Sequence, residues 1–294
     1  MPFERSLLDE VINKLKNDPL FKERLFPDII NQKGVFPAIR KDKITFYYKG
    51  GKLFTYSKDG YETHYKYGII PKNIKNNYIK ESNLQNISLY DSFKEGYKKI
   101  KECCELYCGI EAEYVSKLYI CSGMNPYNSV ILLDTEVRFD SDNDSIDENL
   151  DKKQRKQNIE RIDTLLYNTE SKQLCFCEAK HFSNKELWAE ESSKPQVCSQ
   201  INKYNKTIET RTDEIIKQYQ NYVDIFNKLF DTSIPKPESI FMKTGLLIFG
   251  YDSNQKNKIN ELLIRDGSLE GISYYNTGNL KGNQIATLYD SITK

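Results

Sequence analysis

RIDTLLYNTESKQLCFCEAK, at residues 161–180, is the stretch that decides the fold. Its two apolar segments flank a polar, turn-like NTES, which predicts two neighbouring β-strands near 161–167 and 173–179. Three charged side chains stand where these segments end or bend, and charged side chains rarely fill a protein core. The stretch therefore predicts two neighbouring strands that carry a group of charges at their ends.

The segments around these strands alternate between helical and extended patterns. An amphipathic helix is predicted over 5–17 with Ser6 as its cap, and the turn signals KGG and KDG predict an antiparallel meander over 43–68. Helical spacing returns over 91–118, and the β-branched, apolar SVILLDTEVRF at 129–139 predicts a strand. Further along, the sequence predicts a polar excursion over 140–158, a long helix over 195–229, a buried strand over 244–252, a helix over 256–266, a short strand over 272–278 and a final helix near 282–292. Strands followed by helices in the second half predict a mixed α/β core, with a parallel pairing across the long helix.

A polar, Asn-rich connector at 72–90 is the predicted domain boundary. It separates an N-terminal module of one helix and an antiparallel β-meander, residues 1–90, from a larger domain, residues 91–294. The larger domain is predicted to hold a central mixed β-sheet flanked by helices. A chain of 294 residues is long enough for such a domain with an appended module.

The composition limits the class of protein. Lys and Arg number 43 against 42 Asp and Glu, which neither indicates nor excludes a nucleic-acid partner, because such binding depends on local clustering. No secretory signal is visible, and no apolar window reaches the ~18 residues of a membrane span. The seven cysteines suggest no disulfide framework, so we expect a cytoplasmic protein without membrane contact. A phosphate-binding GxxxxGK[ST] motif is absent, so no nucleotide cofactor is expected.

Asp163, Glu178 and Lys180 have the chemistry of a magnesium site. Glu178 and Lys180 are two residues apart on one strand, so their side chains leave the same face, which Asp163 on the neighbouring strand can approach. The two carboxylates and the Ala179 carbonyl would bind Mg²⁺, which accepts few protein carboxylates alongside waters and a substrate phosphate. The ion would lower the pKa of a bound water, while Lys180 would orient that water and stabilise developing negative charge. Glu136, on the preceding strand, would hold a second metal ion or a metal-bound water.

Each of these assignments has a plainer alternative. Asp163, Glu178 and Lys180 can instead take part in cross-strand ion pairing at the surface, which would contribute only about 0–1 kcal/mol to the stability of the protein. Asp134, Glu136 and Arg138 stand at every second position of their strand, so Glu136 can belong to a solvated strand face. His181 leaves the opposite face of its strand and is expected to be structural. Basic residues interleaved with aromatics over 43–68 can stack on bases and hold phosphates, but β-propensity favours an apolar core made of these aromatics.

The order of these motifs resembles the core of the PD-(D/E)xK nuclease superfamily, which has the restriction-endonuclease-like fold. The matching residues are Ile162-Asp163, then Glu178-Ala179-Lys180, and on the long helix Gln200-Ile201-Asn202-Lys203-Tyr204. Ile162 stands in place of the family's proline, and the helix motif is similar to the QxxxY element of the RecB-like branch. The resemblance spans roughly residues 91–252. It implies that Gln200 and Tyr204 contact the substrate backbone or support the metal site, with Gln196 one turn earlier on the same helix face.

The resemblance also implies an activity. We expect Mg²⁺-dependent hydrolysis of DNA phosphodiester bonds, with Mn²⁺ as a substitute, by an endonuclease in restriction or defence against foreign DNA. Cleavage of both strands would favour a homodimer, and residues 1–90 would serve DNA or partner recognition. The alternatives are a RecB-like repair or recombination nuclease, an RNA-cutting effector, and a non-catalytic nucleic-acid-binding module on a nuclease fold.

Overall fold

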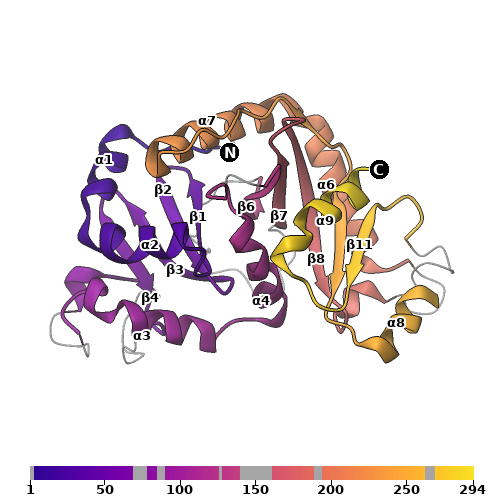
Figure 1. Cartoon of the computed structure of the whole chain (residues 1–294), viewed down its shortest axis with the longest axis horizontal. Helices are drawn as coiled ribbons and strands as arrows, with labels where there is room; N and C mark the ends of the chain where they lie inside the picture. The colour runs from indigo at the N-terminus through magenta and orange to yellow at the C-terminus, as the bar shows by residue number, and fades with distance from the viewer. Residues whose placement is uncertain are drawn as a thin grey trace, which may run out of the picture.

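The protein is a mixed α/β chain with two β-sheets, one antiparallel with five strands and one mixed with six (Figure 1). The fold is taken from a computed structural model, which describes residues 3–68, 78–84, 90–125, 128–139, 161–188, 194–261 and 269–294. The mixed α/β class predicted from the sequence is confirmed. The predicted excursion over 140–158 lies outside the described residues, and the domain boundary at 72–90, of which only part is described, stays a prediction.

The N-terminal sheet is a meander whose strands pair in chain order: β1 (Val35–Arg40), β2 (Lys43–Tyr48), β3 (Gly51–Ser57), β4 (Gly60–His64) and β5 (Tyr78–Lys80). The predicted antiparallel meander is confirmed, but the sequence analysis missed β1 and β5. Lys49 and Gly50 form the tight turn between β2 and β3 with φ of 51° and 79°, the positive values that such hairpin turns require. A side chain on Gly50 would overlap Ala112, so this glycine allows the turn to lie directly against a later helix.

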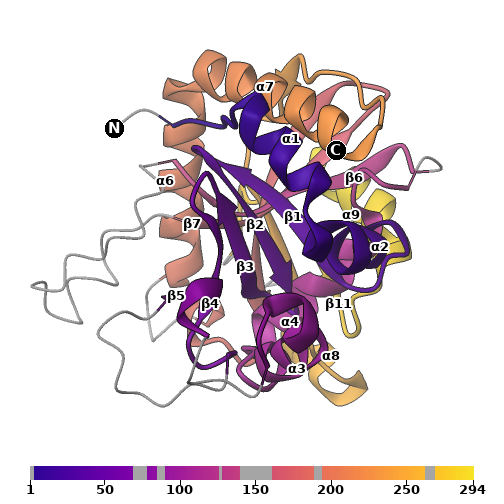
Figure 2. The same cartoon turned by 90° about the vertical axis from the view of Figure 1, so that its left-hand side faces the viewer.

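One face of the N-terminal sheet is covered by helices, as Figure 2 shows from that side. They are α1 (Asp9–Asn17), a π-helical turn (Phe21–Leu25), α2 (Phe26–Ile30) and α3 (Phe93–Leu106). Strand register places Ile39, Ile44 and Phe46 on this face, where they join the apolar core. The predicted start of the first helix is wrong: α1 begins at Asp9 without a side-chain cap, and the Ser6 hydroxyl instead donates to the Glu4 carboxylate at 3.1 Å.

The opposite face of the N-terminal sheet meets the second sheet and its helices. Phe36, Ala38 and Tyr47 share this face and pack in one core with side chains of β6, β7 and β8, whose bounds follow. The helices in this layer are α4 (Ile110–Ser116) and α9 (Ile285–Thr293). The helix predicted over 91–118 is therefore two helices, α3 and α4, which lie against different parts of the N-terminal sheet.

The mixed sheet has the strand order β11–β10–β8–β7–β6. Its strands are β6 (Val130–Arg138), β7 (Arg161–Asn168), β8 (Gln173–His181), β10 (Gly245–Phe249) and β11 (Tyr274–Thr277), with the short β9 (Ser239–Ile240) beside β8. β6, β7 and β8 are antiparallel, whereas β10 and β11 run parallel to β8 and to each other. The helical crossover between β8 and β10 confirms the predicted parallel pairing.

The long helix predicted over 195–229 is two helices, α6 (Gln196–Thr210) and α7 (Thr212–Phe230). The break falls at Arg211, which leaves helical geometry with φ −125° and ψ 20°. Its guanidinium pairs locally with Glu214 at 2.8 Å and donates to the Phe139 carbonyl at 2.8 Å, so one contact that is distant in sequence helps to stabilise the bend. After the bend, α7 runs alongside both sheets (Figure 1).

In the C-terminal part, β10, β11 and α9 match the strands predicted over 244–252 and 272–278 and the final helix predicted near 282–292. α8 (Ser253–Ile259) begins three residues before the helix predicted over 256–266, with a capping box between Asp252 and Gln255, and residues 262–266 of that prediction lie outside the described residues. Within the described part of the chain, no helix has the length and apolar character needed to cross a membrane. All seven cysteines are free thiols, and six of them are buried.

Candidate active site

The paired strands β7 and β8 bring the predicted acids and lysine together. Side chains on β8 alternate, so Glu178 and Lys180 share a face, and the Lys180 Nζ lies 2.9 Å from Oε1 of Glu178. On β7, Oδ2 of Asp163 accepts a hydrogen bond from the backbone N–H of Ala179 at 2.8 Å. The three groups therefore converge at one end of the two strands, as the sequence predicted.

Two of these charges are buried and the third is half-buried. Glu178 is 2% and Lys180 6% exposed, and Asp163 keeps part of its surface in contact with solvent. Burial raises the pKa of Glu178 to about 7, against the opposing effect of Lys180. Burial, followed by the charges of Glu178 and Glu136, raises the pKa of Asp163 well above its usual range. Glu178 and Lys180 do form an ion pair, but it is buried and joins two residues of one strand, so it is not the exposed cross-strand pair of the plainer reading.

Buried carboxylates of this kind attract a proton or a cation. Oε2 of Glu178 is buried and accepts no hydrogen bond, while its other oxygen faces Lys180. Among the described residues, no group of three or more His, Cys, Asp or Glu side chains is arranged to hold a metal ion. Asp163 and Glu178 alone fit Mg²⁺, which takes few protein carboxylates and completes its shell with water and phosphate. The predicted roles of the Ala179 carbonyl and of a second ion stay predictions.

Glu186 is a member of this cluster that the sequence analysis missed. It lies in a single helical turn (Lys185–Leu187) shortly after β8, and its Oε2 is 2.5 Å from the Lys180 Nζ. Burial alone would lower the pKa of Lys180, but the charges of Glu178 and Glu186 outweigh burial and raise it. Lys180 is therefore a firmly protonated ammonium held between two carboxylates. In the sequence, the one signal that pointed to Glu186 was its position six residues after Lys180.

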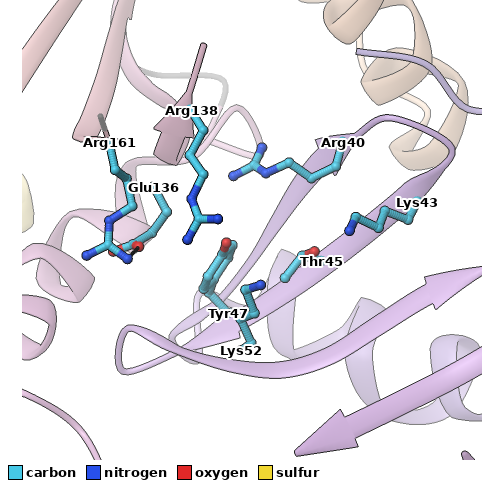
Figure 3. A pocket seen from close by; sticks show the side chains of 8 residues that line it. All are labelled: Arg40, Lys43, Thr45, Tyr47, Lys52, Glu136, Arg138 and Arg161. Atoms are coloured by element: carbon cyan, nitrogen blue, oxygen red, sulfur yellow. Dashed lines mark ion pairs between the residues drawn. The ribbon is translucent and has the colours of Figure 1, made fainter. Parts of the chain in front are cut away.

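Glu136 faces the same region from β6. Its backbone is in the left-handed region, with φ of 57°, which is uncommon for a residue other than glycine and marks an irregularity in the strand. The Glu136 carboxylate pairs with Arg161 at 2.6 Å (Figure 3), and Arg161 begins β7 two residues before Asp163. Glu136 thus lies beside the candidate site but is held by an arginine.

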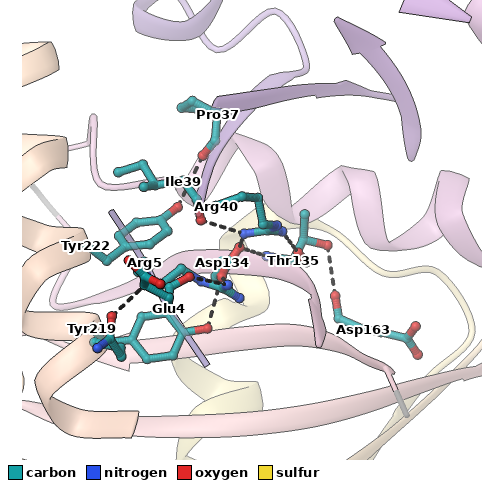
Figure 4. Close-up of polar contacts among 11 residues, drawn as sticks. Glu4, Arg5, Pro37, Ile39, Arg40, Asp134, Thr135, Asp163, Tyr219 and Tyr222 are labelled. Carbon is teal, nitrogen blue, oxygen red and sulfur yellow. Dashed lines mark hydrogen bonds and ion pairs between the residues drawn. The ribbon is translucent and has the colours of Figure 1, made fainter. Parts of the chain in front are cut away.

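The reading of β6 as a solvated strand face is wrong, because its Asp134 is fully buried. Figure 4 shows Asp134 at the centre of a polar network, where Arg40 lies 2.8 Å and Arg5 3.4 Å from its carboxylate. The Tyr219 hydroxyl donates to the same carboxylate at 2.9 Å. The next residue, Thr135, donates its hydroxyl to the Asp163 carbonyl at 2.8 Å. The network therefore connects the N-terminal sheet and α7 to the strand that carries Asp163.

A cleft of about 440 Å³ opens beside Asp163, whereas Glu178 and Lys180 do not line it. It is lined by Asp163, Glu136 and Arg161 on the sheet side, and by the start of α4 and the loop after β8 on the other. Glu111 of α4 accepts hydrogen bonds from the His181 backbone N–H at 3.0 Å and from the Asn184 amide at 2.6 Å. Glu111 thereby fixes the end of β8 against α4. No sequence pattern links Glu111 to this strand, so it was missed.

The predicted helix residues support the site from behind. Tyr204 is buried, and its hydroxyl donates to the Arg161 carbonyl at 2.7 Å, while the Gln200 amide donates to the Tyr204 hydroxyl at 3.0 Å. This arrangement fits the supporting role, and Tyr204 has no surface for a substrate. Gln196 is exposed one turn earlier, and its predicted contact with substrate stays a prediction.

Comparisons with known proteins gave no relative: no protein-family model, no curated protein and no solved structure matches this chain. The reading of the site therefore depends on its own geometry.

Proposed function

We propose that this protein is a metal-dependent nuclease with a restriction-endonuclease-like core that hydrolyses DNA phosphodiester bonds. The observation that carries the proposal is the convergence of the half-buried Asp163 with the buried Glu178 and Lys180 at one end of β7 and β8. The strand arrangement supports it, because an antiparallel β6–β7–β8 group followed by parallel β10 and β11 suits the fold implied by the motif order. The cleft beside Asp163 offers access to a substrate.

Each residue has a defined part in this proposal. Asp163 and Glu178 would hold Mg²⁺, which when bound supplies a water of lowered pKa and offsets charge on the phosphate. Lys180, kept protonated by its two acidic neighbours, would orient the attacking water and stabilise the negative charge that develops on the phosphate. Tyr204 would keep the start of β7 in place through the Arg161 carbonyl.

The proposal includes an endonuclease that cuts DNA in a defence setting, with Mn²⁺ able to replace Mg²⁺ and two copies needed to cut both strands. The test is incubation of the purified protein with closed circular plasmid, linear duplex and RNA, each with Mg²⁺, with Mn²⁺ or with EDTA. A closed circle has no ends, so its nicking identifies an endonuclease. If the protein cuts RNA and leaves both DNA substrates intact, it is an RNA-cutting effector.

Three variants sharpen this test. Lys180→Ala and Asp163→Asn should lower the cleavage rate by about 10²–10³-fold each, the usual effect of losing one charge-stabilising group. Glu238→Ala is the control, because Glu238 is exposed and its carboxylate pairs with the surface residue Lys172 at 2.6 Å. Equal cleavage by all variants would refute the assignment. DNA binding without any metal-dependent cleavage would instead favour the non-catalytic module.

A further inference from the structure

A second pocket, here named the cationic pocket, lies between the N-terminal sheet and the strands that carry the candidate site (Figure 3). It is lined by Arg40, Lys43, Thr45, Tyr47, Lys52, Glu136, Arg138 and Arg161. These side chains come from β1, β2 and β3 on one side and from β6 and β7 on the other. Both sheets therefore contribute side chains to the wall of this pocket.

Strand register explains why these residues share one place. Lys43, Thr45 and Tyr47 alternate along β2 and so leave the same face. Arg40 on β1 is the cross-strand partner of Lys43, and Lys52 on β3 is the partner of Tyr47, after a bulge in β3. The face that is apolar near Phe36 and Ala38 thus becomes cationic towards its other end.

The charge of the lining favours an anion. It carries five cationic side chains and one carboxylate, that of Glu136. Asp134 lies behind the pocket and pairs with Arg40, so among the residues that the structure describes five cations stand beside two carboxylates. Burial raises the pKa of Tyr47 to about 12, which keeps its hydroxyl protonated and able to donate at neutral pH.

The size and position of the pocket narrow the ligand further. The space is about 30 Å³, close to the volume of one water molecule, so it has room for one oxygen of an anionic group and not for a sugar or a base. Glu136 and Arg161 line both this pocket and the cleft that contains Asp163. A group held here would lie one side chain away from the candidate site.

Most aromatics of the same sheet are too buried to hold bases. Five of them are at most 7% exposed, which confirms the apolar-core reading for Tyr47, Phe54, Tyr56, Tyr61 and Tyr67. Tyr48 and Tyr65 are half-buried and pack against the same core. Recognition by this face therefore depends on its cations and hydroxyls, which contact phosphate rather than base.

We propose that the cationic pocket binds a phosphate group of a nucleic-acid strand, next to the phosphate that is cut. The identity of the strand as substrate rests on the proposed function. The N-terminal sheet would thus position the strand, and each phosphate contact would strengthen binding without reading base sequence. An internal phosphodiester and a terminal 5′-phosphate share this chemistry.

The test measures binding without cleavage. Fluorescence anisotropy of a labelled duplex oligonucleotide in EDTA, over a series of salt concentrations, gives the affinity and its salt slope for the wild-type protein and two charge reversals. Lys52→Glu removes a cation from the pocket, whereas the control Lys58→Glu changes an exposed lysine in the turn after β3. Lys52→Glu should weaken binding about tenfold for every base sequence and reduce the salt slope by about 1, with Lys58→Glu close to wild type. Thermal melts of both variants check folding, and Lys52→Gln provides a milder change if Lys52→Glu fails to fold.

The outcomes separate this proposal from the proposed function. Equal affinity and slope for the two reversals would overturn the phosphate pocket, even if the wild-type protein cleaves DNA. A pocket-dependent slope in a protein that never cleaves would overturn the nuclease and keep the pocket. No binding at all in EDTA would overturn the pocket, while the cleavage assay with Mg²⁺ decides the nuclease. Repeating the measurement with 5′-phosphorylated and 5′-hydroxyl oligonucleotides identifies the source. A preference for the 5′-phosphate that Lys52→Glu abolishes indicates a terminal group, and equal affinities indicate an internal one.

Discussion

Replacing Asp134 by alanine should destabilise the whole protein, because Asp134 is the acid at the centre of a buried polar network. Its carboxylate lies 2.8 Å from Arg40, 3.4 Å from Arg5 and 2.9 Å from the Tyr219 hydroxyl. Arg5 is 0% and Arg40 3% exposed, so the variant leaves two guanidinium groups away from water without this partner. Breaking a buried pair in this way costs about 3–5 kcal/mol. That is a large part of the about 5–15 kcal/mol by which proteins are usually stable.

Urea denaturation monitored by circular dichroism measures this loss. Glu238→Ala is the matched control, since its exposed pair with Lys172 should contribute only about 0–1 kcal/mol. A triple variant, Asp134→Leu with Arg5→Met and Arg40→Met, should recover most of the stability, because no uncompensated charge stays buried. If Asp134→Ala unfolds within about 1 kcal/mol of wild type, the assigned role of the network is wrong.

Three further predictions concern the site. Mg²⁺ should raise the melting temperature more at about pH 8 than at about pH 5.5. At the lower pH the folded protein keeps a proton on Glu178, because the pKa of this carboxyl is raised on folding, and this proton competes with the metal ion. The metal-free protein therefore loses stability as the pH rises from 4.5 to about 7, and a pH-independent shift would contradict the ligand role of Glu178. Glu186→Gln should lower the cleavage rate about tenfold, less than Lys180→Ala, because Lys180 keeps its contact with Glu178. Tyr204→Phe should cost about 1–2 kcal/mol in urea denaturation, because the buried Tyr204 loses its 2.7 Å hydrogen bond to the Arg161 carbonyl and the one it accepts from Gln200.

Sequence patterns located the centre of the site because its parts are local. The alternation of side chains along a strand predicted that Glu178 and Lys180 share one face. The short turn between the two predicted strands indicated that the strand with Asp163 lies next to them. The same local signals predicted β2, β3 and β4 from their turn residues. These features depend on residues that are close along the chain.

The remainder depended on contacts that no local pattern contains. Arg211 interrupts the predicted long helix because it binds the Phe139 carbonyl, and Glu111 reaches the end of β8 from a helix that precedes the whole sheet. Asp134 resembles a surface residue in the alternation of β6, but two arginines from the first forty residues bury it. Pro37 obscured β1, since proline is uncommon in sheet interiors.

The buried position of Arg5 has a consequence for synthesis of the protein on the ribosome. The Arg5 backbone N–H donates to Gln218, which lies 213 residues later, at 2.8 Å. At about 5–20 residues per second, translation takes about 10–40 s to supply that partner. During this interval the segment around Arg5 lacks its partner on α7, so docking of this segment is a late event in folding.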